Sequence, residues 1–178
     1  MTKSKSEIRQ AAKSAVKALT IEQRQAKSAL IFSHIASLPE VKSAKTIALY
    51  HALPDEVITE QFIATLAPHK QIVLPRVEGE DMEFYPYEPD NLERGAFGII
   101  EPQGAEAIEP AQIDLIIVPG VAFTRSGKRC GRGKGYYDKY LSREGFRATK
   151  IGVCYAEQLA EDIPNEPHDI VMDRVLFG

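Results

Sequence analysis

The sequence has few of the features that mark secreted, membrane-spanning or metal-binding proteins. Its 178 residues include only two cysteines, Cys130 and Cys154, which cannot form a disulfide framework and lie in no CxxC or Cys/His spacing. The first residues form no apolar stretch of the kind found in secretion signals. The most apolar run, 113–123, contains an aspartate, a proline and a glycine and is too short to cross a bilayer. We expect a cytoplasmic, soluble protein with no membrane partner.

An overall excess of positive charge is also missing. The formal net charge is -3, so the molecule as a whole would not bind nucleic acid or an acidic membrane surface. The cations between Lys128 and Lys134 are therefore a local feature of a mildly acidic protein. Local charge of this kind favours a small anionic ligand over a polyanion. We expect a monomer with a small-molecule substrate and no nucleic-acid partner.

Helical periodicity is found in four parts of the chain. Ser4 and Thr20 each begin a capping box, which predicts helices from these two positions. A third helix is expected after Thr59 and should end at Pro68, and a fourth should end at about Glu144. The expected apolar face of the second helix consists of Ala26, Leu30, Ile31, Ile35 and Leu38.

Short apolar runs predict strands that are buried on both faces. They lie at 46–50, 71–75, 113–123, 150–155 and 169–177. Residues 88–112 are rich in Pro, Gly and Glu, and we expect them to form a long surface excursion. Strands that alternate with helices predict one domain over residues 1–178, a three-layer α/β/α sandwich with a mainly parallel sheet.

The stretch 129–141, RCGRGKGYYDKYL, combines alternate glycines with basic residues. Such glycines let the backbone come close to a ligand, and exposed N–H groups before a helix bind anions. The spacing GxGxG fits neither the Walker A motif nor the Rossmann fingerprint. The stretch is either a phosphate-binding loop of another kind or a mobile surface loop with solvated cations.

Three residues near this loop have two interpretations each. Asp138 lies in the first turn of the expected helix, where it either complements the helix dipole or ligates Mg²⁺ beside bound phosphates. Lys5 and Arg9 lie four residues apart on the first helix, and like charges at this spacing are mildly unfavourable. They either hold an anion between them or belong to an ordinary solvated basic face.

The order of several motifs resembles the 5-formyltetrahydrofolate cyclo-ligase family, also called methenyltetrahydrofolate synthetase. The matching segments are KSEIR near the N-terminus, PDEVIT after the first strand, LPR (74–76), EP (101–102), VPGVAFTRSGKRCGRGKGYYDKYL, and MDRVLF near the C-terminus. The resemblance implies a reaction of 5-formyltetrahydrofolate with MgATP that gives 5,10-methenyltetrahydrofolate, ADP and phosphate through a phosphorylated formyl group. It also implies a sandwich related to certain sugar-phosphate isomerases and CoA transferases.

The same resemblance implies roles for individual residues. ATP would contact Lys5, Arg9, Arg129, Cys130, Gly131, Arg132, Gly133, Lys134, Gly135, Tyr136 and Tyr137. The folate would contact Arg9, His51, Glu56, Arg132 and Tyr136, and the catalytic residues would be Arg132, Lys134 and Tyr136. Magnesium would be held by Asp138 and Asp173. The family usually has leucine at the position of Cys130, so we interpret this side chain as a packing residue.

Two rival functions fit parts of the pattern. An ATP-independent isomerase or transferase would use the glycine loop for a substrate phosphate and would need no metal. A non-catalytic binder of nucleotide or RNA would stack bases on Tyr136, Tyr137 and Tyr140. The spacing of Tyr136 and Tyr140 also fits simple helix packing, and the net charge of -3 argues against RNA.

Overall fold

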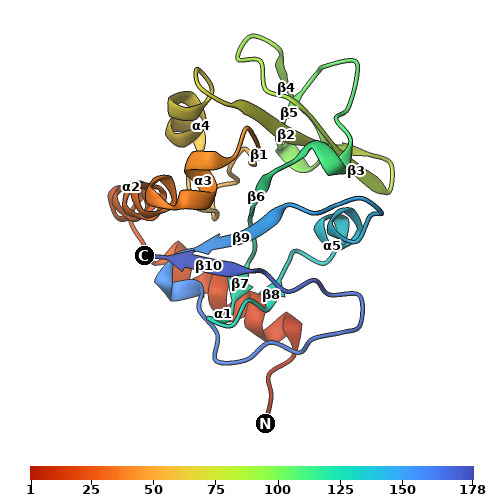
Figure 1. Cartoon of the computed structure of the whole chain (residues 1–178). Helices are drawn as coiled ribbons and strands as arrows, with labels where there is room; N and C mark the ends of the chain where they lie inside the picture. The colour runs from red at the N-terminus through yellow and green to blue at the C-terminus, as the bar shows by residue number, and fades with distance from the viewer.

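A six-stranded, mostly parallel sheet forms the centre of the molecule (Figure 1). This computed structural model describes the backbone of residues 1–178 and all side chains except that of Ala96. The strand order is β10-β9-β6-β1-β2-β3, and every neighbouring pair is parallel except β2 and β3. The strands are β1 (Thr46–Ala48), β2 (Gln71–Glu78), β3 (Asp81–Pro86), β6 (Leu115–Val118), β9 (Thr149–Cys154) and β10 (Arg174–Phe177).

Helices begin where the capping residues predict them. The hydroxyls of Ser4 and Thr20 accept hydrogen bonds from the backbone of Glu7 and Gln23, which completes both capping boxes. The helices are α1 (Lys5–Lys17), α2 (Ile21–Ser37), α3 (Pro39–Ser43), α4 (Glu60–Leu66) and α5 (Tyr136–Leu141), with 3-10 turns η1 (Ala96–Gly98), η2 (Pro110–Gln112) and η3 (Ala156–Gln158). Among the residues described, no helix has the length and apolar composition that a membrane crossing needs.

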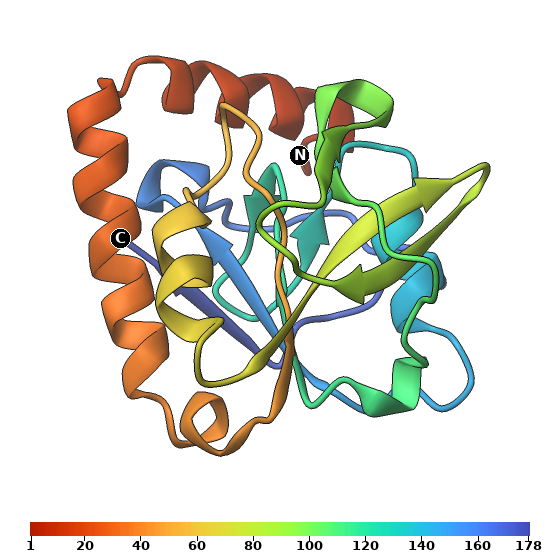
Figure 2. The ribbon, with the colours of Figure 1, turned by 90° about the horizontal axis from the view of Figure 1, so that it is seen from above.

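The two faces of the sheet are covered by different helices. Ile47 and Ile117 belong to the core shared with α2, α3 and α4, whereas their neighbours Ala48 and Ile116 belong to the core shared with α5. This alternation follows from the twofold period of a strand. Both views place α2 and α4 on one side of the sheet and α5 on the other (Figure 1; Figure 2). The predicted three-layer architecture is confirmed; the implied kinship with isomerases and CoA transferases stays a prediction.

The predicted strand 113–123 is wrong in its extent. Strand β6 ends at Val118, where Pro119 and Gly120 follow. Proline has no N–H to donate to a strand ladder. The chain then turns into a separate two-stranded sheet of β7 (Ala122–Phe123) and β8 (Arg129–Cys130). This small sheet packs against α1 and leads directly into the glycine loop.

The predicted surface excursion 88–112 contains regular structure. Strands β4 (Leu92–Arg94) and β5 (Ile100–Pro102) form an antiparallel hairpin. The buried carboxylate of Glu101 accepts a hydrogen bond of 2.7 Å from the backbone N–H of Val77 and so ties the hairpin to β2. The 3-10 turn η1 lies at the tip of the hairpin.

Some element boundaries and one helix face also differ from the prediction. On α2, Ala26 and Leu30 are exposed, and Ser28 and Phe32 are buried beside the correctly predicted Ile31 and Ile35. A core-facing serine is tolerated here because its hydroxyl is hydrogen-bonded. Helix α5 ends at Leu141, and β10 begins only at Arg174.

The order of the parallel strands creates an opening at one edge of the sheet. Helix α4 connects β1 to β2 on one face, whereas α5 lies between β6 and β9 on the other face. Because β1 and β6 are neighbours, the chain leaves their carboxyl ends toward opposite faces of the sheet. Doubly wound sheets bind ligands at such a switch point.

Candidate active site

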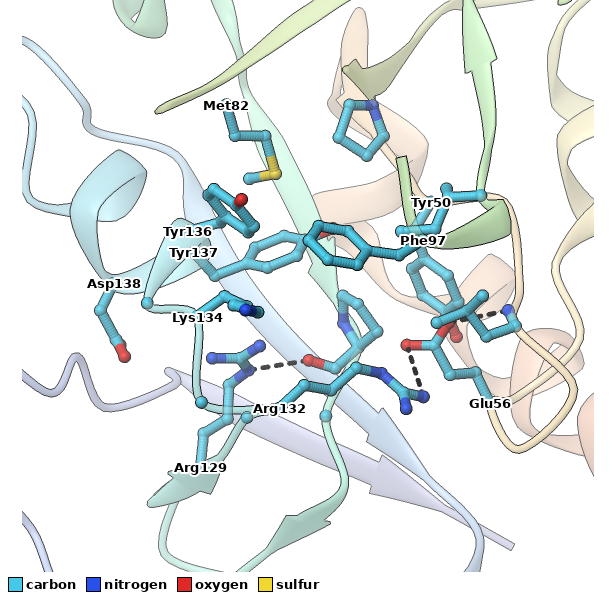
Figure 3. Close-up of a pocket in the computed structure, with 18 of the residues that line it drawn as sticks. Tyr50, Glu56, Met82, Phe97, Arg129, Arg132, Lys134, Tyr136, Tyr137 and Asp138 are labelled. Carbon is cyan, nitrogen blue, oxygen red and sulfur yellow. Dashed lines mark hydrogen bonds and ion pairs between the residues drawn. The ribbon is translucent and has the colours of Figure 1, made fainter. Parts of the chain in front are cut away.

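A cleft of about 770 Å³ lies at this switch point (Figure 3). Tyr50 and His51 line it after β1, and Pro119 and Gly120 line it after β6. Helix α1, the glycine loop (131–135) and the β4–β5 hairpin contribute further walls. Segments from almost the whole length of the chain therefore meet at one cavity.

Hydrogen bonds from two arginines fix the start of the glycine loop and the strand β8 that leads into it. Arg9 Nε donates to the Gly131 carbonyl oxygen over 2.7 Å, and Arg129 Nε donates to the Pro119 carbonyl oxygen over 2.7 Å. A Cβ on Gly131 would lie 3.0 Å from a terminal nitrogen of Arg129, and Gly133 has a φ of 101°. The loop needs glycine for close approach at the first position and for backbone conformation at the second.

Three cations of the cleft have no carboxylate partner among the described side chains. They are Arg9, Arg129 and Lys134. Burial lowers the pKa of Arg129, and the charge of Asp138 opposes this effect. Unpaired cations in a partly desolvated site are stabilised by an anionic ligand. This part of the cleft is suited to phosphate groups.

Two other predicted ATP contacts are already paired with protein carboxylates. Lys5 Nζ lies 2.5 Å from Asp169 Oδ2, and a terminal nitrogen of Arg132 lies 2.5 Å from Asp55 Oδ1. Lys5 and Arg132 both line the cleft. Any ligand phosphate would have to share these cations with the acids that hold them now.

Glu56 is one of the buried acids of the cleft, and its side chain is only 8% exposed. Its Oε1 accepts a hydrogen bond of 2.8 Å from the Leu53 N–H, and Oε2 lies 3.6 Å from a terminal nitrogen of Arg132 (Figure 3). Burial raises the pKa of Glu56, and the positive charge of Arg132 partly offsets this rise. The carboxyl group is therefore easier to protonate than an ordinary glutamate.

An aromatic wall faces the cations. Tyr136 from the start of α5 and Phe97 from the tip of the hairpin have ring centroids 6.4 Å apart, and Lys134 Nζ lies 5.4 Å from the Phe97 ring centroid. Tyr50 and Met82 complete this apolar part (Figure 3). Phe97 is 60% exposed and has a positive φ of 57°, a conformation that non-glycine residues rarely adopt. The wall is suited to a planar ring.

The sequence did not predict Phe97, Tyr50 or Met82 as site residues. Phe97 lies in the segment GAFG, in which no strand or helix period is present. One signal was available, since an aromatic residue between glycines in a polar segment gains nothing from exposure unless it contacts a partner. In the sequence, Tyr50 and Met82 cannot be told from ordinary core residues because they adjoin apolar strands.

Cys130 and Asp173 do not line the cleft, in contrast to the other predicted site residues. The Cys130 side chain is fully buried behind the loop, with Sγ 3.8 Å from the Lys5 carbonyl oxygen, and burial raises the pKa of this thiol. Asp173 instead accepts a hydrogen bond of 2.8 Å from the Lys150 N–H, with its Oδ2 3.5 Å from Lys150 Nζ. Neither side chain therefore faces the cleft, and the ATP contact of Cys130 and the metal contact of Asp173 stay predictions.

Asp138 does line the cleft, as predicted for a metal ligand. Its Oδ1 accepts a hydrogen bond of 3.1 Å from the Ile170 N–H. Within the described residues, no cluster of three or more His, Cys, Asp or Glu side chains is placed to hold a metal ion. A metal in this cleft would depend on one or two carboxylates together with ligand oxygens, which is the usual arrangement for Mg²⁺ bound with phosphates.

The predicted folate contact His51 lines the cleft beside the turn that carries Glu56, and its Nδ1 lies 3.8 Å from Glu60 Oε1. Tyr140, by contrast, is 1% exposed and packs edge-on against Phe84 with ring centroids 4.8 Å apart. A residue buried in this way cannot stack on a base. This part of the RNA-binding alternative is wrong, and the helix-packing interpretation of Tyr140 is confirmed.

Comparison with known proteins gives one consistent result. A model described as the 5-formyltetrahydrofolate cyclo-ligase family matches residues 1–178. The 5-formyltetrahydrofolate cyclo-ligase of Mus musculus is 28% identical, over 96% of this chain and 91% of its own length. That of Haemophilus influenzae is 31% identical, over 89% of this chain and 88% of its own length.

Two solved structures are also similar over nearly the whole chain. The 5,10-methenyltetrahydrofolate synthetase of Aquifex aeolicus superposes with a TM-score of 0.88 at 38% identity, covering 97% of this chain and 89% of that chain. The 5,10-methenyltetrahydrofolate synthetase of Mycoplasma pneumoniae superposes with a TM-score of 0.78 at 28% identity, covering 97% of both chains.

Proposed function

The chain belongs to the 5-formyltetrahydrofolate cyclo-ligase family, and from this premise we propose that it uses MgATP to convert 5-formyltetrahydrofolate into 5,10-methenyltetrahydrofolate, ADP and phosphate. It is an enzyme of the cyclo-ligase class, whose relatives are named as methenyltetrahydrofolate synthetases. The dependence on ATP and magnesium and the phosphorylated intermediate are the parts that need testing.

One observation carries the proposal: a single cleft combines two different chemistries. The unpaired cations Arg9, Arg129 and Lys134 suit a triphosphate, and the aromatic pair Phe97 and Tyr136 suits the planar ring of a folate. Both ligands would then lie in the same cavity of about 770 Å³. Phosphoryl transfer requires this kind of proximity, because the protein contributes mainly positioning and charge stabilisation.

The proposed reaction has two steps. The formyl oxygen attacks the γ-phosphorus of ATP, the bond to the ADP oxygen breaks, and an N5-iminium phosphate forms. The folate N10 then attacks the formyl carbon, loses its proton, and the carbon–oxygen bond breaks to release phosphate. Lys134 and Arg132 would neutralise the negative charge on the transferred group, and Tyr136 would hold the folate beside it.

Magnesium would neutralise phosphate charge when bound with ATP, and Asp138 is the residue of this chain that fits it. One of its oxygens is engaged by the Ile170 N–H, which fixes the carboxylate and leaves the other oxygen for a cation. A single carboxylate is sufficient for Mg²⁺ when phosphates and water complete its shell. Asp173 has no part in this proposal because its carboxylate is bound to Lys150 outside the cleft.

The test is a spectroscopic assay with purified protein. With 5-formyltetrahydrofolate and MgATP, we expect the ultraviolet absorbance of the methenyl product to appear, together with one ADP per product formed. Omission of ATP, or addition of a chelator in excess over magnesium, should abolish the signal. Turnover without ATP would instead support the isomerase or transferase alternative. Folded protein that gives no product under any of these conditions would refute the assignment.

A further inference from the structure

The turn after β1 presents two successive carboxylates to one guanidinium group. Arg132 donates from both terminal nitrogens to Asp55, over 2.5 Å to Oδ1 and 3.3 Å to Oδ2. The nearest oxygen of Glu56 lies 3.6 Å from the same guanidinium. Arg132 therefore forms a two-bonded pair with Asp55 and only a longer contact with Glu56.

The acid that lies closer to Arg132 is the more exposed of the two. The Asp55 side chain is 32% exposed, whereas that of Glu56 is 8% exposed. Coulomb attraction is stronger at low dielectric, so an unrestrained guanidinium would favour the buried acid. Arg132 instead binds the more exposed acid, because both of its terminal nitrogens donate to Asp55.

This arrangement leaves one oxygen of Glu56 available. Oε1 is fixed by the Leu53 N–H at 2.8 Å, and Oε2 has only the 3.6 Å contact with Arg132. Glu56 lines the cleft, and a carboxylate oxygen without a close donor can accept a hydrogen bond there. It would gain most from an N–H group that a ligand brings into the cleft.

We propose that Asp55 is a positioning residue that holds Arg132 away from Glu56, so that Glu56 Oε2 stays free to accept a hydrogen bond from the bound folate. The inference rests on the proposed function, since it takes the folate to be the ligand that Glu56 meets. Asp55 itself contacts neither substrate in this role; it acts through Arg132.

Loss of the Asp55 charge should change Glu56 in two ways. Arg132 would be released and could close on Glu56 Oε2, and the repulsion between the two carboxylates would disappear. Both changes lower the pKa of Glu56. The other charged or titratable groups that face Glu56 are Arg129, Tyr50 and Tyr137, and none of them is altered by the substitution.

The turn that carries both acids does not depend on the Asp55 charge. Arg24 donates to the Pro54 carbonyl oxygen, and Tyr155 Oη donates to the Glu56 carbonyl oxygen over 3.1 Å. The Glu56 N–H also donates to the Leu53 carbonyl oxygen over 3.0 Å. Asp55→Asn should therefore fold, and its effects should report on the site.

The experiment compares Asp55→Asn, Asp55→Glu and the parent enzyme. For Asp55→Asn we expect the KM and the equilibrium Kd for 5-formyltetrahydrofolate to rise about tenfold, the loss of roughly one hydrogen bond to a charged group. The KM for ATP should change much less. The acid limb of kcat/KM against pH should move to lower pH, and Asp55→Glu, which keeps the charge, should recover most of both effects.

Asp162→Asn is the matched control, because it removes a carboxylate from a 2.7 Å ion pair with Lys128 outside the cleft. It should leave both KM values and the pH profile unchanged. Parental folate affinity and an unmoved acid limb in Asp55→Asn would overturn the proposal, as would an equal loss for both substrates. If the parent enzyme binds folate but does not turn over, the proposed function fails, while the comparison of Kd values still decides the role of Asp55.

Discussion

At the scale of single residues, two fully buried tyrosines differ in what their hydroxyls contact. Tyr155 Oη lies 3.2 Å from Ser28 Oγ and 3.1 Å from the Glu56 carbonyl oxygen, whereas Tyr140 Oη has no hydrogen-bond partner among the described residues. We expect Tyr155→Phe to lower the free energy of unfolding by about 1–3 kcal/mol, because it leaves a buried carbonyl unsatisfied. Denaturant titration would measure this loss.

Tyr140→Phe is the matched comparison, since it makes the same chemical change at a residue that is 1% exposed. Removal of an unpartnered buried hydroxyl should be neutral or slightly stabilising. Equal destabilisation by the two substitutions would show that the network around Ser28 and Tyr155 contributes nothing specific to the turn that carries Glu56.

Glu56 should also make stability depend on pH. Because burial raises its pKa in the folded protein, the unfolded chain loses the proton first as pH rises. The carboxyl therefore costs stability above the ordinary glutamate pKa, and the cost grows until pH passes the folded pKa. We expect Glu56→Gln to melt at a higher temperature than the parent at neutral pH, with a difference that shrinks below about pH 4. A constant difference across this range would contradict the explanation.

At the scale of elements, one buried acid helps to tie the β4–β5 hairpin to β2, together with Arg76, whose Nη1 donates to the Pro102 carbonyl oxygen over 3.2 Å. Glu101 binds the Val77 N–H over 2.7 Å, and its cross-strand partner Glu93 is exposed. Glu101→Ala should loosen the hairpin and with it Phe97, so we expect the KM for the folate to rise several-fold and the unfolding free energy to fall by about 1–3 kcal/mol. Steady-state kinetics with each substrate varied in turn would test this.

Glu93→Ala removes the same side chain from the opposite strand and should leave both quantities near the parental values. A rise in the KM for ATP as large as that for the folate would instead indicate that the hairpin supports the whole cleft.

Elements with strong local signals were predictable, and those held by distant contacts were not. The capping boxes at Ser4 and Thr20 fix the start of α1 and α2 through neighbours in sequence. The hairpin is tied to β2 by the contacts of Glu101 with Val77 and of Arg76 with Pro102, which no local sequence pattern reveals. The break at Pro119 was visible in the sequence, but the apolar residues on both sides concealed it.

The candidate site shows the same division. The cations and glycines of the loop were predictable because they are contiguous, from Arg129 to Gly135. Of the aromatic wall only Tyr136 was predicted, since Tyr50, Met82 and Phe97 come from three separate segments that only the fold brings together. Nor could spacing alone reveal that Asp55 holds Arg132, because the two residues are 77 positions apart.

At the scale of the whole molecule, the proposed state is one cytoplasmic chain that forms a single domain over residues 1–178. A net charge of -3 gives no general attraction to polyanions. We expect sedimentation equilibrium to give a single species near 19.7 kDa, with no retention on RNA or on acidic lipid vesicles at physiological salt. A concentration-dependent increase in mass would refute the monomer proposal.

Helix α1 joins the cleft through partners that are far away in sequence. Arg9 and Gly131 are 122 positions apart, and Lys5 and Asp169 are 164 positions apart. At a synthesis rate of roughly 5–20 residues per second, the first helix waits about 8–30 s before Asp169 is made. During translation the basic face of α1 therefore leaves the ribosome without its partners, and the enzyme becomes competent only after synthesis is almost complete.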